Sequence, residues 1–175
     1  MIIINKRNLF FLISVWLLST LLSAQNVTIS TPHTQLLLSV PNGGTPEQLY
    51  YGSRTSDADI RSICETARRR NAYPVYGMGY PCETALSVRH ADGNLTLQMA
   101  VIGVKETRLT KENATLTVIE LKDKVYPFFV NICYKAWQDA DVIETWTEIR
   151  HEEKKPVQLQ QFAVSYTHLR AHETP

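Results

Sequence analysis

The chain has 175 residues, with 18 Lys and Arg against 17 Asp and Glu, so its formal net charge is +1 at pH 7. This balance gives none of the excess positive charge that nucleic-acid-binding proteins carry. The length also excludes a complete eight-stranded (β/α) barrel, which typically takes about 250 residues.

Residues 1–24 are typical of a secretory signal peptide. Lys6 and Arg7 precede an uncharged apolar run over residues 9–22, shorter than the roughly 20 apolar residues that a membrane span needs. We expect cleavage after Ala24 and export to the periplasm or the extracellular medium, with no membrane span. An uncleaved N-terminal anchor stays open as the alternative, because Leu22 stands where a small residue is usual.

Short apolar and β-branched runs, separated by turn residues, follow from Val27 onward. Their spacing is typical of an all-β sandwich. They predict strands at residues 27–30, 35–40, 48–51, 85–90, 95–105, 114–121, 126–137, 142–150 and 157–162. A charged turn at residues 152–156 precedes the last of them.

Two local patterns refine this expectation. In the run 114–121, Ile119 and Leu121 point to one side and Leu116 to the other, which predicts a strand covered on one face only. Asp92 and Gly93 separate two predicted strands and predict a tight hairpin, because Gly accepts positive φ and Asp bonds its own backbone.

One helix is expected to interrupt the strands. Residues 55–70 place Ile60 and Ile63 at helical spacing, with Ser56 as a cap. Acidic residues near the start and Arg68–Arg70 at the end would complement the helix dipole. We therefore predict a short inserted helix whose three arginines are solvated.

The carboxylates give no catalytic pattern. A retaining glycosidase needs two carboxylates close together, whereas Glu144, Glu148 and Glu152 recur at four-residue steps along predicted strand, too far apart for a pair. We interpret them as surface residues. We assign no catalytic residue, no cofactor-binding residue and no metal ligand, and substrate-binding residues stay unassigned.

Aromatic residues within the later strands allow two interpretations. They could form a sugar-stacking platform, but core or domain-interface packing is favoured because aromatic side chains dominate burial. The residues are Tyr126, Phe128, Phe129, Tyr134, Trp137 and Trp146.

The histidines and cysteines ahead of residue 165 give no metal pattern either. Three histidines occur singly, so structural or surface roles are favoured: His33, His90 and His151. Three cysteines contain no CxxC motif, so buried thiols are favoured and one disulfide stays open: Cys64, Cys82 and Cys133.

Four segments together resemble the N-terminal domain of the family 36 α-galactosidases. They are LYYG at residues 49–52, YPVYG at 73–77, ALSVRHADG at 85–93 and DADVIETWTEIRHEEKKPVQLQQF at 139–162. Their order and spacing are more specific than any one of them, and the resemblance covers most of residues 35–163. It departs from the family at PCETAL, residues 81–86, where many relatives carry a basic or aromatic residue.

The resemblance implies a large β-sandwich, or supersandwich, over residues 25–164, ahead of a (β/α) barrel that holds both catalytic aspartates. The whole enzyme would release terminal galactose from α-galactosides such as melibiose or raffinose, by a retaining mechanism without a cofactor. The partners implied are the missing catalytic domain and, through it, an α-galactoside oligosaccharide.

The resemblance also implies a homo-oligomer. Some members form tetramers in which a loop of this domain reaches a neighbouring active site, and the candidate loop here is residues 53–72. No substrate contact is carried over, although Asp57, Asp59 and Arg68–Arg70 within it can be tested.

The segment SYTHLRAHETP, residues 165–175, departs from the family pattern, and we interpret it as a non-native tail. His168 and His172 lie four residues apart within it. No Glu follows His168 and no third ligand is evident, so zinc is not expected.

Two other hypotheses remain. A stand-alone secreted carbohydrate-binding sandwich would bind sugar by itself, without exposed apolar surface. A secreted structural or adhesion module would show neither sugar binding nor activity.

Overall fold

The computed structural model of the chain describes residues 25–79 and 83–163, and these form three antiparallel sheets. The first sheet has the order β1-β2-β3-β4, in which each strand pairs with its neighbour along the chain. Its strands are β1 (Gln25–Ser30), β2 (Thr34–Val40), β3 (Glu47–Ser53) and β4 (Arg70–Asn71).

The second sheet is a meander of long strands in the order β6-β7-β8-β9. Its strands are β6 (Met99–Leu109), β7 (Ala114–Asp123), β8 (Phe128–Trp137) and β9 (Val142–His151). A single turn of 3₁₀-helix, η1 (Thr110–Glu112), joins β6 to β7. The third sheet pairs β5 (Leu86–Arg89) with β10 (Gln158–Phe162).

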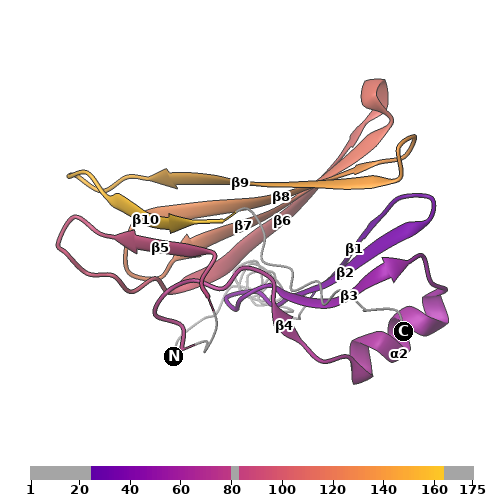
Figure 1. Cartoon of the computed structure of the whole chain (residues 1–175), viewed down its shortest axis with the longest axis horizontal. Helices are drawn as coiled ribbons and strands as arrows, with labels where there is room; N and C mark the ends of the chain where they lie inside the picture. Colours follow the sequence, from indigo (N-terminus) through magenta and orange to yellow (C-terminus); the bar gives the residue numbers. More distant parts are fainter. Residues whose placement is uncertain (1–24, 80–82, 164–175) are drawn as a thin grey trace, which may run out of the picture.

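The sheets form two layers with the core between them (Figure 1). The β6–β9 sheet is one layer, and both β5–β10 and the β1–β4 sheet lie against its inner face. Alternate residues of β8 line that face: Phe128, Val130, Ile132, Tyr134 and Ala136. Each fully buried aliphatic side chain stabilises the folded state by roughly 1.5–3 kcal/mol. The two packed layers of sheet confirm the predicted all-β sandwich.

The alternation predicted for β7 is also confirmed. Ile119 and Leu121 are buried in the core, at 0% and 1% exposure, while Leu116 on the opposite face is half-buried. The period-two geometry of a strand puts successive side chains on opposite faces. One face of the β6–β9 sheet therefore packs inward and the other is solvated.

The inserted helix is present but shorter than predicted. It is α2 (Asp57–Thr66), and Ser56 caps it as expected, because the Ser56 Oγ accepts a hydrogen bond from the Asp59 N–H at 3.3 Å. The prediction that Arg68–Arg70 end the helix is wrong, since no basic residue lies in its last turn. Pairing of Arg70 with Gln48 draws the chain into β4 instead.

The segment around α2 covers the outer face of β2. Gln35 Oε1 accepts a hydrogen bond from the Thr55 N–H at 2.9 Å, and Arg69 donates to Ser39 Oγ at 3.2 Å. Arg69 also pairs with Glu47 at 3.0 Å. Gln35 and Ser39 are buried beneath this cover, so β2 is enclosed on both faces.

The hairpin predicted at Asp92 and Gly93 is wrong, although the turn itself forms. Gly93 has φ +92°, and Asp92 Oδ1 accepts from the Asn94 N–H at 2.9 Å, as a side-chain-closed turn requires. The flanking strands do not pair with each other, because β5 pairs with β10 and β6 with β7. The second of these strands starts only at Met99.

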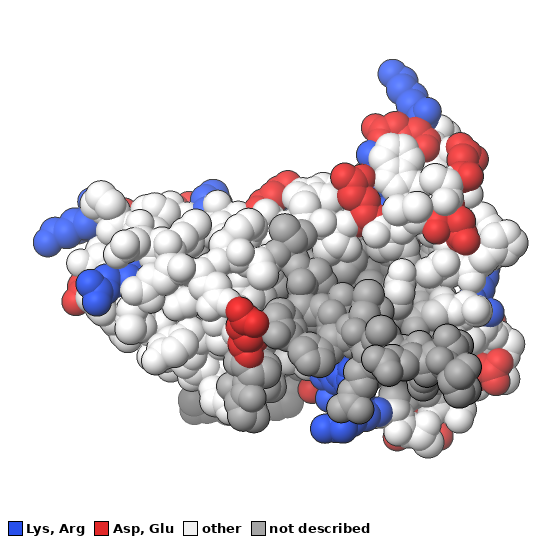
Figure 2. Space-filling view, in the orientation of Figure 1, with Lys and Arg blue, Asp and Glu red and all other residues white. Residues whose placement is uncertain are grey.

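Among the described residues, no helix has the length and apolar content to cross a membrane. The predicted signal peptide, Cys82 and the predicted tail lie outside the described residues. On the face shown in Figure 2, acidic and basic side chains are interspersed and neither sign forms a broad patch.

Candidate functional site

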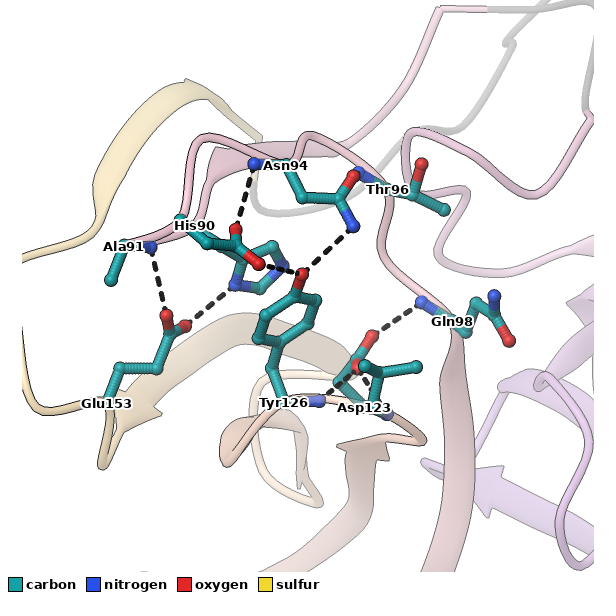
Figure 3. A network of polar contacts seen from close by, with 10 residues as sticks. His90, Ala91, Asn94, Thr96, Gln98, Asp123, Tyr126 and Glu153 are labelled. Carbon is teal, nitrogen blue, oxygen red and sulfur yellow. Dashed lines mark hydrogen bonds and ion pairs between the residues drawn. The ribbon is translucent and has the colours of Figure 1, made fainter.

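Three turns converge near the end of β5, and their side chains form one polar network (Figure 3). The first turn, residues 90–94, closes through the hydrogen bond from the His90 N–H to the Asn94 carbonyl at 2.8 Å. The second follows β7 at residues 123–127, and the third is the charged turn at residues 152–156 before β10. The residues that meet here are therefore far apart in sequence.

His90 is the buried centre of this network. Its ring is 0% exposed, and Nδ1 lies 2.7 Å from Glu153 Oε1, while Glu153 Oε2 accepts from the Ala91 N–H at 3.0 Å. A carboxylate only accepts hydrogen bonds, so Nδ1 carries the hydrogen. From the sequence, His90 is expected to be an isolated histidine, because no nearby residue indicates that its partner lies 63 residues away.

Tyr126 lies flat against this histidine. The two ring centroids are 3.7 Å apart with planes 9° apart, and Phe128 meets the imidazole edge-on at 5.9 Å. The Tyr126 hydroxyl donates to Asp92 Oδ2 at 2.7 Å and accepts from Asn94 Nδ2 at 3.0 Å. The phenol ring is thus fixed at its face and at its hydroxyl.

The same contacts set the ionisation of Asp92 and Tyr126. The hydrogen bond from Tyr126 is the main reason that the pKa of Asp92 is lowered, and the Asn94 N–H adds to it. The hydrogen bond to Asp92 in turn raises the pKa of Tyr126. At neutral pH the pair is therefore a carboxylate beside a neutral phenol.

Asp123 fixes the backbone of the second turn through hydrogen bonds. Its carboxylate is buried, at 2% exposure, and Oδ1 accepts from the N–H groups of Val125 and Tyr126, each at 2.7 Å. Oδ2 accepts from the N–H of Gln98. These bonds satisfy a buried charge with backbone donors, and they hold Tyr126 in place through the backbone.

An open hollow of about 460 Å³ lies over this network. It is lined by Ala91, Asp92, Tyr126, Pro127, Glu152, Glu153, Lys154 and Lys155. Within residues 25–79 and 83–163, Lys154 and Lys155 make no ion pair, whereas Glu152 pairs with Arg150. The hollow therefore presents an aromatic ring, a carboxylate and two ammonium groups.

The carboxylates of the hollow are arranged for structure and hydrogen bonding. A retaining glycosidase needs one carboxyl group to protonate the leaving group and one to attack. Here Glu153 is engaged by His90 and Ala91, and Asp92 by Asn94 and Tyr126. Both carboxylates are therefore held by hydrogen bonds within the network.

The predicted aromatic group divides between two places. Phe128 and Tyr134 are core residues, as favoured, and burial raises the pKa of Tyr134 well above its usual value. Trp137, Trp146 and Phe129 are half-buried. Cross-strand pairs place these three on the opposite face of the β6–β9 sheet from the core.

The glutamates interpreted as surface residues are exposed and bond to that outer face. Glu144 accepts from Trp137 Nε1 at 3.0 Å, and Glu148 accepts from Trp146 Nε1 at 3.2 Å. The Lys135 ammonium lies 3.9 Å from the Trp137 ring centroid. The indoles are thus partnered along their edges by carboxylates.

The remaining predicted residues lie apart from the hollow. His33 and His151 are exposed. Cys133 is buried, which raises the pKa of its thiol to about 11, and Cys64 is half-buried with its thiol 3.2 Å from Asn26 Nδ2. In the part of the chain that the structure describes, no group of three metal-ligating side chains forms.

The candidate inter-subunit loop, residues 53–72, contains α2 and is largely exposed. Asp57 and Asp59 face solvent at the helix start, and Asp59 Oδ2 accepts from Ser56 Oγ at 2.7 Å. None of these residues lines the hollow.

The described residues form a two-layer, all-β sandwich that carries a polar turn cluster at one end. The family model described as "Glycosyl hydrolase family 36 N-terminal domain" matches residues 44–174. The chain belongs to this family. The match includes most of the segment interpreted above as a tail, and that interpretation stays a prediction.

Solved structures share the fold. The α-galactosidase from Lactobacillus brevis is 16% identical with a TM-score of 0.69, and covers 81% of this chain and 23% of its own. An AgaA α-galactosidase variant from Geobacillus stearothermophilus was solved in complex with 1-deoxygalactonojirimycin. It is 13% identical with a TM-score of 0.72, and the match covers 81% of this chain and 24% of the variant. The galactosidase domain of the α-galactosidase–sucrose kinase AgaSK is 21% identical with a TM-score of 0.66, and the match covers 79% of this chain and 24% of that domain.

The chain therefore spans about a quarter of the length of these enzymes. Other variants of AgaA have been solved with raffinose and with stachyose. A search of curated proteins found no match.

Proposed function

We infer that this chain is the non-catalytic N-terminal sandwich of an α-galactosidase that removes terminal galactose from α-galactosides of the melibiose and raffinose type. The observation that carries the proposal is the family match over residues 44–174. The reaction itself is assigned to a (β/α) barrel further along the protein, with a nucleophilic and an acid carboxylate and a retaining mechanism.

The arrangement of charged groups supports this division of labour. Within the described residues, the carboxylates of the hollow are held by backbone and aromatic partners, and Glu144 and Glu148 bond indole groups on the outer face. The raffinose and stachyose complexes of AgaA support an α-galactoside as substrate. The same proposal includes export directed by residues 1–24 and a role in carbohydrate metabolism. It also includes assembly into a homo-oligomer through residues 53–72.

The test compares galactose release by two proteins. The first is this chain alone, and the second is the product of the complete reading frame from the source DNA. We expect raffinose and melibiose to be hydrolysed by the second protein and not by the first, with retention of the anomeric configuration followed by NMR. Hydrolysis by the chain alone, or an inactive complete product that is folded, would contradict the proposal.

A further inference from the structure

The hollow over the turn network has the features of a sugar-binding site. It is an open hollow of about 460 Å³. It is the meeting point of three turns whose side chains are fixed by one another (Figure 3). We propose that this hollow binds the galactosyl unit of an α-galactoside, as a subsite separate from catalysis.

Tyr126 supplies the stacking surface. His90 covers one face of its ring at 3.7 Å, and Tyr126 lines the hollow whereas His90 does not. A pyranose ring has C–H groups that pack on an aromatic face, and the axial hydroxyl of galactose leaves a continuous C–H patch on one side. Because the ring is fixed before the ligand arrives, little conformational entropy is lost on binding.

Polar groups around the ring match sugar hydroxyls. Asp92 keeps acceptor capacity, since each carboxylate oxygen has two lone pairs and each accepts one hydrogen bond within the network. Lys154 and Lys155 provide donors that no carboxylate of the described residues engages. A sugar hydroxyl both donates and accepts, so it can use both kinds of group.

The carboxylate beside the aromatic ring favours a neutral ligand at that position. Glu152 pairs with Arg150 and Glu153 with His90, so Asp92 is the lining carboxylate without an ion pair among the described residues. An anionic ligand would meet the exposed Asp92 carboxylate beside the ring. A neutral glycoside avoids this repulsion and still uses the hydrogen-bonding groups. The choice of galactose as the ligand rests on the proposed function. The argument that a sugar ring stacks on Tyr126 is independent of that function.

The experiment follows amide shifts of the full, ¹⁵N-labelled chain during titration with raffinose, and with sucrose as the matched ligand that lacks the galactosyl unit. We expect saturable shifts at residues 91–94, Val125 and Tyr126 with raffinose and none with sucrose. Tyr126→Ala should weaken binding about tenfold, because it removes a stacking contact worth roughly 1.4 kcal/mol.

Two further variants separate loss of binding from loss of folding. The exposed pair Lys154→Ala and Lys155→Ala should keep the spectrum of the fold and weaken raffinose binding about fivefold, the effect of one hydrogen bond. Tyr51→Ala, at an exposed tyrosine outside the hollow, should leave binding unchanged.

The proposal is overturned if raffinose causes no saturable shift, if sucrose binds equally well, or if the shifts lie elsewhere and survive Tyr126→Ala. These results do not depend on hydrolysis. An inactive complete protein with raffinose bound at the hollow would contradict the proposed function alone, and an active one without such binding would contradict this inference alone.

Discussion

The imidazole of His90 lies flat on the phenol ring of Tyr126, with ring centroids 3.7 Å apart, although the two residues belong to different turns. Glu153, from a third turn, holds the imidazole at 2.7 Å. This contact joins the ends of the β5–β10 pair and of the β7–β8 hairpin. The stacked pair therefore links the two layers of the sandwich at one end.

Replacing His90 should destabilise the domain strongly. His90→Ala removes the stacked ring and leaves the Glu153 side chain, only 7% exposed, without its histidine partner. We expect the free energy of unfolding in urea to fall by about 3 kcal/mol. His151→Ala, at an exposed histidine, is the control and should change it by less than about 0.5 kcal/mol. Equal effects of the two variants would show that the buried pair is unimportant.

Removing the Tyr126 hydroxyl should change the titration of Asp92. The bond from Tyr126 is the largest cause of the lowered pKa of Asp92, so Tyr126→Phe should raise that pKa toward its usual value. Because the folded-state pKa is lowered, the stabilisation is present above the unfolded-state value of about 3.9 and is lost as the pH falls through the folded-state value.

Carboxyl ¹³C NMR of Asp92 between pH 2 and 6 provides the measurement, with Tyr51→Phe as the control. An unchanged Asp92 titration in Tyr126→Phe would contradict the hydrogen bond. The variant should also show a smaller loss of stability at acid pH than the native chain.

Gly77 should tolerate no side chain. Its φ is +97°, and a Cβ would lie 2.6 Å from Thr96 Cγ2 and 3.0 Å from Thr96 Cα. Gly77→Ala should therefore lower the free energy of unfolding by about 3 kcal/mol, through backbone strain and a clash. Gly43→Ala is the matched control, because Gly43 also has positive φ but open space around it, and strain alone predicts about 1 kcal/mol. Similar losses in both variants would contradict the close approach of Thr96.

The thiol of Cys133 should react slowly while the chain is folded. Burial raises its pKa to about 11, so at pH 8 only about a thousandth of it is thiolate. In a Cys82→Ser background, Ellman's reagent should label Cys64 first and Cys133 only after denaturation. Rapid labelling of two thiols in the native chain would show that Cys133 is accessible.

Strand positions follow from local sequence, and their pairing does not. Alternation placed Ile119 and Leu121 in the core, and the Ser56 cap was recognisable, because both depend on near neighbours. Asp92 and Gly93 form the expected turn, but which strand pairs with β5 depends on β10, some 70 residues later. Likewise, the helix stops early because β4 pairs with β3.

The candidate site was not predictable for the same reason. No residue near His90 in the sequence indicates its partner, because Glu153 lies 63 residues away. Tyr126 packs against the core, as favoured, but its stacking on His90 has no local signal. The charged turn and the RHADG segment were both recognised as turns. Only the fold shows that these turns meet, and that Tyr126 is among the residues that line the open hollow over them.

The most direct test of the central claim is to sequence the continuous reading frame across Ala163 in the source DNA with long reads. The account predicts that the frame continues into a catalytic (β/α) barrel, which typically takes about 250 residues. A frame that reads SYTHLRAHETP and then stops would contradict it, and sugar binding by the sandwich itself would become the main hypothesis.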